Sequence, residues 1–143
     1  MNDPNGLCWY KGNYHVFYQY SPLDANRGNI FWGHYTSPDL LNWTKQPTFL
    51  YPVDPWDLNG VYSGSALAED DALYLYYTGN VKYPGNYDYI YEGRGHHVCL
   101  AVTKDGIHAD SNELLLSNDC YPSDMSCHVR DPKVWKMDGK YYM

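Results

Sequence analysis

The chain has 143 residues, a formal net charge of −7 and 17 tyrosines, while charged residues make up only 19% of it. This length is sufficient for a domain with its own core, and the acidic balance argues against a nucleic-acid-binding protein. The absence of a run of about 18 apolar residues predicts no membrane span. No secretion signal is visible ahead of Asn2, so we expect a cytoplasmic protein.

The first third of the chain predicts a small β-sheet. Strands are expected at 7–10, 14–20 and 31–36, with an outer strand at 48–51. Before the first strand, the stretch 2–6 (Asn-Asp-Pro-Asn-Gly) has turn chemistry, because proline fixes φ and Asn-Gly tolerates positive φ. The short carboxylate of Asp3 is therefore predicted at the mouth of a strand.

The same order of elements then returns. Further strands are expected at 62–68, 72–78, 97–102 and 114–116, with a long loop at 79–95. A third copy starts at Arg130-Asp131-Pro132 and runs into an aromatic strand at 140–143. The Asp-Pro pairs that open the first and third copies indicate a repeat of about 64 residues.

A repeat of this size, made of short strands, is typical of the blades of a β-propeller, whose inner strands start at a central channel. A β-sandwich is the alternative fold, but it does not explain the repeat. We therefore predict an all-β propeller, of which this chain holds about two blades and the start of a third. Because a propeller closes with about four to eight blades, we expect the chain to be part of a longer protein.

The repeat brings the starts of the inner strands to one end of the channel. Asp3, Ser63, Arg130 and Asp131 are then expected in one pocket. Two carboxylates with a cation and a hydroxyl suit glycoside hydrolysis, because a retaining mechanism needs one carboxylate as nucleophile and one carboxyl group as acid.

Other polar residues have a structural interpretation. Asp39 and Asp105 recur in the same turn of successive copies, so we predict that both stabilise that turn. His34 is expected to be packed and hydrogen-bonded, and His96 and His97 to lie in a loop. The four cysteines fit no zinc spacing, and we predict no metal site.

Five motifs carry a resemblance to a known family. They are Asn2-Asp3-Pro4-Asn5-Gly6, Phe17-Tyr18-Gln19-Tyr20, Phe31-Trp32-Gly33-His34, Tyr62-Ser63-Gly64-Ser65 and Arg130-Asp131-Pro132. In this order they resemble the invertases and fructanases of glycoside hydrolase family 32, including its bacterial members. The resemblance implies a five-bladed propeller followed by a C-terminal β-sandwich. Residues 1–143 would then be part of the N-terminal catalytic propeller domain.

The resemblance also implies roles for individual residues. Asp3 would be the nucleophile that attacks a β-fructofuranoside such as sucrose or sucrose-6-phosphate, and Asp131 would stabilise the transition state. An oxocarbenium-like transition state gives both carboxylates a physical role, because they stabilise developing positive charge. The positions that match the fructose pocket are Asn2, Gln19, Trp32, Ser63 and Arg130. No cofactor is implied, since carboxylates perform this chemistry.

The sequence departs from the family pattern in two places. The family's general acid is a glutamate followed by cysteine, and none of Glu69, Glu92 and Glu113 precedes a cysteine. We therefore expect the acid beyond residue 143 and residues 1–143 alone to be inactive, because losing general acid catalysis costs about 10²- to 10⁴-fold. Arg27 replaces a tryptophan found in many invertases, and it either faces a substrate phosphate or is a solvated loop residue.

Two other functions stay open. A non-catalytic sugar-binding propeller would keep the aromatic residues without needing both aspartates. A related glycosidase would act on arabinose or xylose polymers instead. Asp3 and Asp131 at equivalent strand starts favour an enzyme, while Gln19 and the motif around Trp32 favour fructose. The preference among sucrose, sucrose-6-phosphate and fructans is left open, as are fructosyl transfer and the oligomeric state.

Overall fold

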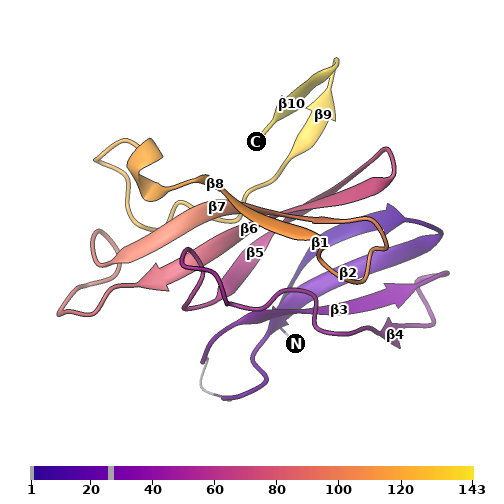
Figure 1. The fold of residues 1–143 in the computed structure, drawn as a ribbon, viewed down its shortest axis with the longest axis horizontal. Coiled ribbons are helices and arrows are strands. Elements are labelled where there is room, and N and C mark those ends of the chain that lie inside the picture. The colour runs from indigo at the N-terminus through magenta and orange to yellow at the C-terminus, as the bar shows by residue number, and fades with distance from the viewer. Residues whose placement is uncertain (1, 26–27) are drawn as a thin grey trace.

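The computed structural model describes residues 2–25 and 28–143, so Arg27 lies outside the described residues. It contains two four-stranded antiparallel sheets and a short hairpin (Figure 1). The first sheet consists of β1 (Asn2–Tyr10), β2 (Asn13–Tyr20), β3 (Phe31–Ser37) and β4 (Thr44–Lys45). The second consists of β5 (Val61–Glu69), β6 (Ala72–Lys82), β7 (Arg94–Thr103) and β8 (Ser111–Leu116). A 3-10 helix, η1 (Asn118–Cys120), precedes the hairpin of β9 (Trp135–Met137) and β10 (Lys140–Tyr142).

Both sheets pair their strands in the order of the sequence, which confirms the predicted repeat and the all-β class. β1 of the first sheet contacts β5 of the second, and β9 and β10 project beyond both sheets (Figure 1). The third copy of the repeat is thus represented by its first two strands. Within residues 2–25 and 28–143, no helix has the length and apolar character required to cross a bilayer.

The core lies between the two sheets and follows from the alternation of side chains along the strands. On β6, Leu73, Leu75 and Tyr77 are fully buried, while the tyrosines between them are partly exposed. Phe17 and Trp32 meet this face from the first sheet, and the Trp32 and Tyr77 rings lie 6.2 Å apart between centroids. Packing in this apolar layer fixes the positions of the starts of β1 and β5 relative to each other.

A β-bulge interrupts the pairing near the start of the first strand in each sheet. Asn2 pairs with Gln19 and Pro4 with Tyr18, so Asp3 is the extra residue of the bulge in β1. Ser63 is the extra residue at the corresponding place in β5. A bulge turns a side chain away from the regular pleat and commonly borders an active site.

The outer strand predicted at 48–51 is wrong. The fourth strand of the first sheet is Thr44–Lys45, and Leu50 forms only an isolated bridge with Trp32. Phe49 and Leu50 are both buried, whereas a regular strand would send these neighbours to opposite faces. Pro47 also lacks the N–H that a continuous ladder requires.

The long loop is shorter than expected, since β6 continues to Lys82 and β7 begins at Arg94. His96 and His97 are therefore buried strand residues, so the loop position expected for them is wrong, while the strand predicted from residue 97 is confirmed. The prediction for His34 is confirmed: its ring stacks on Phe17 and its Nε2 lies 3.0 Å from Nδ1 of His15. Burial, followed by the charge of His15, lowers the pKa of His34 to about 3.

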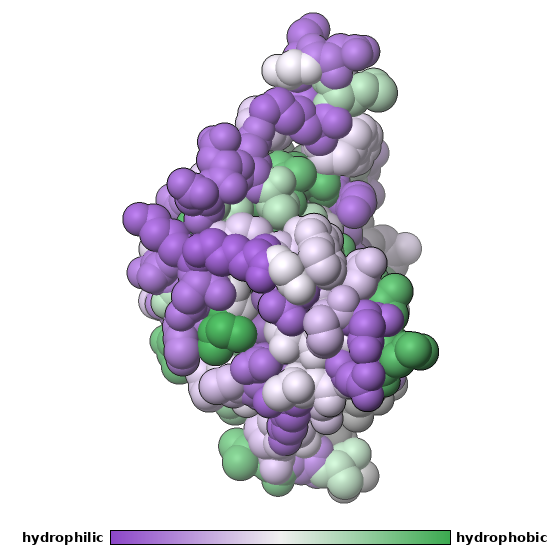
Figure 2. All heavy atoms as spheres, turned by 90° about the vertical axis from the view of Figure 1, so that its right-hand side faces the viewer, coloured by the Kyte–Doolittle hydropathy of each residue, from purple (hydrophilic) through white to green (hydrophobic). Residues whose placement is uncertain are grey.

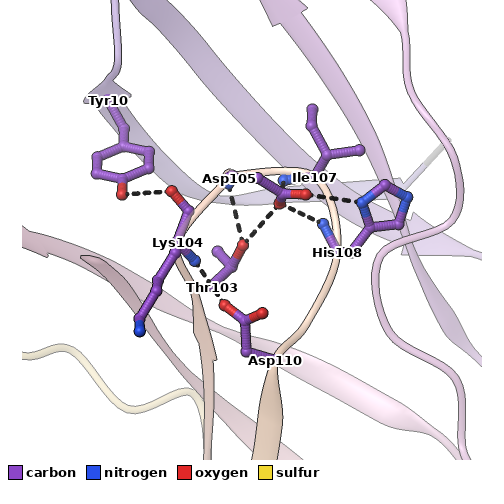
Figure 3. A network of polar contacts seen from close by, with 8 residues as sticks. Tyr10, Thr103, Lys104, Asp105, Ile107, His108 and Asp110 are labelled. Carbon is purple, nitrogen blue, oxygen red and sulfur yellow. Dashed lines mark hydrogen bonds and ion pairs between the residues drawn. The ribbon is translucent and has the colours of Figure 1, made fainter. Parts of the chain in front are cut away.

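The structural role predicted for Asp39 and Asp105 is confirmed. In the turn after β7, Oδ1 of Asp105 accepts hydrogen bonds from the backbone N–H groups of Ile107 and His108 and from the Thr103 hydroxyl (Figure 3). The same figure shows the Tyr10 hydroxyl of the first sheet reaching the carbonyl oxygen of Lys104 in this turn, at 2.9 Å. The turn thus also ties the two sheets together.

Asp39 repeats this arrangement after β3. Its Oδ1 accepts from the backbone N–H groups of Leu41 and Asn42 and from the Ser37 hydroxyl. Figure 2 views the molecule from the side of the β1–β2 and β5–β6 hairpin turns, where hydrophilic residues cover much of the surface between scattered hydrophobic ones.

Candidate active site

A pocket of about 860 Å³ opens where β1 and β5 begin. Its size is within the usual range for small-molecule sites. Six of the seven residues predicted from the sequence line it: Asn2, Asp3, Gln19, Ser63, Arg130 and Asp131. A second cavity of about 300 Å³ lies between segments 47–53 and 108–112, and no carboxylate lines it. The larger pocket is therefore the candidate site.

Asp3 enters the pocket from the bulge of β1. Its backbone has a φ of +42°, in the left-handed region that aspartate tolerates better than most residues. The Asn5 side-chain amide donates to the carbonyl oxygen of Asp3 at 3.0 Å and stabilises this turn. Among the described residues, none donates a hydrogen bond to the Asp3 carboxylate, so its oxygens are available to a ligand.

Asp131 reaches the same pocket from the segment that leads to β9. Its backbone is also left-handed, with a φ of +61°. The backbone N–H of Asp131 donates to Oγ1 of Thr78 at 2.8 Å, and the Thr78 hydroxyl in turn donates to the carbonyl oxygen of Ser63 at 3.2 Å. Thr78 is buried on β6, so it joins the third copy of the repeat to the bulge of the second.

The two aspartates are electrostatically linked. Burial raises the pKa of Asp131, and the negative charge of Asp3 raises it further. Arg130 opposes this effect, because its Nε lies 3.6 Å from Oδ2 of Asp131. A carboxyl group whose charged form is disfavoured, beside a second carboxylate and a cation, is typical of functional sites.

Gln19 and Ser63 connect the two sheets across the pocket. The side-chain amide of Gln19 on β2 donates to Oγ of Ser63 at 3.0 Å. Gln19 is also the pairing partner of Asn2, the residue before Asp3. The amide oxygen of Gln19 and the hydroxyl of Ser63 can therefore present hydrogen-bonding groups to a sugar at fixed positions.

Trp32 differs from the expectation that it lines the pocket. Its side chain is fully buried in the core between Phe17 and Tyr77, and it is absent from the pocket wall that the described residues form. Its indole N–H donates to the carbonyl oxygen of Tyr62 at 3.1 Å. From the core side, Trp32 thus fixes the start of β5, next to Ser63.

The structure adds residues that sequence reasoning missed. Tyr62, Lys82, Arg94 and His128 also line the pocket. Lys82 and Arg94 face each other across the β6–β7 pairing, and no sequence motif marks either of them. Thr78 could have been suspected only from its pairing with Tyr62, which requires the strand register.

No glutamate lines this pocket, although all three glutamates are among the described residues. Glu69 ends β5 at the hairpin-turn end, where Lys136 and the Tyr141 hydroxyl bind its carboxylate. Glu92 and Glu113 are exposed to solvent. Across residues 2–25 and 28–143, no group of three or more His, Cys, Asp or Glu side chains is arranged to hold a metal ion. The residues that line this pocket can bind a sugar and stabilise positive charge, but none of them is a glutamic acid.

Comparisons with known proteins show what the chain is similar to. The sucrose-6-phosphate hydrolase of Bacillus subtilis is 44% identical over the whole chain, which spans 28% of that relative. The solved structure of sucrose-6-phosphate hydrolase from Lactobacillus gasseri superposes with a TM-score of 0.81 at 36% identity, covering 98% of this chain and 27% of the other. A Bombyx mori family 32 β-fructofuranosidase variant in complex with sucrose gives 0.78 at 34%, covering 99% and 28%.

The chain thus spans between a quarter and a third of the length of these relatives. The matching structures are β-propellers over this region, which confirms the predicted fold class. The model of the glycosyl hydrolases family 32 N-terminal domain matches residues 1–143. Fold, motifs and pocket agree with that match, and the chain belongs to glycoside hydrolase family 32.

Proposed function

We propose that the full-length protein hydrolyses the terminal β-fructofuranoside bond of sucrose or sucrose-6-phosphate with retention of configuration. The observation that carries the proposal is the convergence of Asp3 and Asp131 on one pocket from the starts of repeated structural units. The Bacillus subtilis relative is a sucrose-6-phosphate hydrolase, and the Bombyx mori neighbour binds sucrose. The five-bladed propeller and the C-terminal β-sandwich are part of this proposal.

In the proposed reaction, an oxygen of Asp3 bonds to the anomeric carbon of fructose while the bond to the leaving sugar breaks. A carboxylic acid protonates the leaving oxygen, and a water molecule then hydrolyses the fructosyl–Asp3 ester. Asp131 stabilises the positive charge on the fructose ring in both steps. The acid is a glutamate outside residues 1–143, so this part alone is expected to be inactive.

The remaining predicted residues position the sugar. Asn2, Gln19, Ser63 and Arg130 hydrogen-bond fructose hydroxyls, and their common pocket supports this assignment. Trp32 acts indirectly, through its hydrogen bond to Tyr62. The chemistry requires no metal or organic cofactor, because three carboxyl groups complete it. A cytoplasmic location in a bacterium is proposed from the bacterial sources of the relatives.

Fructose release from sucrose and from sucrose-6-phosphate tests the proposal in the full-length protein. The parent is expected to release fructose, and Asp3→Asn to abolish release. Asp39→Asn is the matched control, since it makes the same change in a turn away from the pocket. A folded parent that releases fructose from neither substrate would overturn the proposal in favour of an arabinose- or xylose-directed glycosidase, or of a sugar-binding propeller.

A further inference from the structure

One part of the pocket wall carries positive charge that the proposed reaction does not use. Lys82 stands at the end of β6, Arg94 at the start of β7, and His128 in the segment after η1. These residues come from separate segments and meet at one pocket, although the chain as a whole has a net charge of −7. Two cations, Lys82 and Arg94, thus share one wall with His128, and such a basic cluster in an acidic protein marks a place where an anion can be bound.

The ring of Tyr89 orders this cluster. Nζ of Lys82 lies 5.6 Å from the centroid of the ring, and Cζ of Arg94 lies 5.9 Å from it. These distances are those of cation–π contacts, which hold a cation in place without neutralising its charge. Nη1 of Arg94 lies 3.3 Å from Nε2 of His128, which is itself 3.2 Å from the carbonyl oxygen of Tyr89.

The two cations keep unused hydrogen-bonding capacity. Within residues 2–25 and 28–143, neither Lys82 nor Arg94 has a carboxylate oxygen within 4.0 Å. Nε of Arg94 is buried and has no hydrogen-bond partner in the described part of the chain. A buried donor without a partner is unusual in a native protein and calls for a ligand or an ordered water.

The lowered pKa of a neighbouring histidine, His96, is consistent with positive charge at this wall. His96 is fully buried behind the cluster, with its ring 5.6 Å from that of His128. Burial lowers the pKa of His96 to about 3, and the charges of Arg94, Arg130 and His128 add to the effect. Two members of the cluster, Arg94 and His128, therefore disfavour a further positive charge at this wall.

We propose that Lys82, Arg94 and His128 form a subsite that binds the phosphate monoester of a phosphorylated fructoside. The proposal rests on the proposed function, in which the fructose unit occupies the part of the pocket near Asp3 and Asp131. Arginine binds phosphate oxygens through its planar fork and lysine acts as a point charge, so the pair suits a dianion. A pocket of about 860 Å³ is large enough for a disaccharide carrying a phosphate.

Substrate discrimination tests the subsite in the full-length protein. Lys82→Met and Arg94→Gln are each expected to lower kcat/KM for sucrose-6-phosphate by about 10- to 100-fold, the usual effect of losing a hydrogen bond to a charged group. For sucrose, kcat/KM should change by less than about twofold. Lys104→Met is the matched control, because Lys104 is an exposed lysine outside the pocket and should leave both values unchanged.

Two further measurements keep the test independent of folding and of the proposed function. Arg94→Lys preserves the charge but not the fork, so a folded Arg94→Lys protein should show an intermediate loss for sucrose-6-phosphate alone. Inorganic phosphate should bind the parent protein in a calorimetric titration and bind Arg94→Gln at least about 10-fold more weakly. This titration requires no turnover and separates phosphate binding from fructose release.

The outcomes distinguish the two proposals. Equal losses for both substrates in Lys82→Met and Arg94→Gln would overturn the subsite and leave the proposed hydrolysis standing. A parent that shows no preference for sucrose-6-phosphate over sucrose would overturn it as well. If the parent releases fructose from neither substrate, the hydrolysis proposal fails. In that case equal phosphate affinity in parent and Arg94→Gln would overturn the subsite too.

Discussion

The two ends of the sheets use aspartate in opposite ways. At the hairpin-turn end, Asp39 and Asp105 accept several hydrogen bonds from their own turns. At the pocket end, Asp3 and Asp131 are held by their backbones in left-handed conformations. An aspartate whose oxygens are already bonded within its turn stabilises structure, whereas one fixed only through its backbone can bind a ligand.

The pKa shifts follow the same division. Hydrogen bonds from Asn42 and Leu41 lower the pKa of Asp39. Burial works against the charge of Asp105, but the hydrogen bonds from His108, Ile107 and Thr103 outweigh it and lower its pKa. The pKa of Asp131 moves the other way, because burial and Asp3 both disfavour its charged form. Substitutions in the full-length protein test whether the aspartates of the turns and those of the pocket differ in this way.

The largest effect is expected for Asp3→Asn. An amide cannot form the covalent fructosyl intermediate, so kcat should fall by about 10⁴-fold or more. The fold should be unaffected, since the Asp3 side chain is exposed and accepts no hydrogen bond from the described residues. Fructose release and thermal unfolding measure the two effects. A variant that unfolds without a specific loss of kcat would make Asp3 a structural turn residue like Asp39.

Asp131→Asn should lower kcat by about 10²- to 10³-fold, because it removes one anion from the charge developing on fructose. It should also raise the melting temperature at pH 7. A raised folded pKa means that the protonated carboxyl is favoured in the fold, and that this contribution is lost as pH rises through the folded pKa.

Thermal unfolding of the parent and of Asp131→Asn between pH 3 and pH 7 checks the second part. The difference in melting temperature should grow with pH above the ordinary aspartate pKa of about 4. If the substitution lowers the melting temperature at pH 7 instead, Asp131 belongs with the structural aspartates of the turns.

A smaller effect is expected for Thr78→Val, which keeps the shape of the side chain but removes the hydroxyl between Asp131 and Ser63. Asp131 would lose the bond that fixes its backbone, and kcat should fall by about 10-fold, with KM changed less. Thr78→Ser restores the hydroxyl and should restore kcat. A loss of kcat in the serine variant with none in the valine variant would show that Thr78 contributes packing alone.

The smallest effect is expected for Asp105→Ala, which leaves two backbone N–H groups of its turn without partners. The free energy of unfolding should fall by about 1 kcal/mol at pH 7, as for a lost helix cap, with kcat unchanged. Because the pKa of Asp105 is lowered in the fold, its contribution is present above the unfolded pKa and is lost as pH falls through the folded one.

Denaturant unfolding at pH 7 and at pH 3 measures this difference between the parent and Asp105→Ala. A loss of fructose release comparable to that of Asp131→Asn would contradict the division between the two ends of the sheets.

The sequence by itself determined the strand order, the repeat, the structural turns and six of the pocket residues. These features depend on local chemistry: Asp-Pro and Asn-Gly favour turns, and alternating aromatic residues favour strands. The outer strand predicted at 48–51 was wrong because the neighbours Phe49 and Leu50 both pack in the core. The loop predicted at 79–95 was too long because β6 extends to Lys82 and β7 begins at Arg94.

Only the tertiary structure decided which residues meet. Gln19 and Ser63 are 44 positions apart, and Thr78 and Asp131 are 53 apart, yet each pair shares a hydrogen bond. Strand register and the packing of one sheet on the next set these contacts, and neither is encoded in a short motif. For the same reason, only the structure showed that Trp32 is buried in the core and that Lys82, Arg94 and His128 meet on one wall of the pocket.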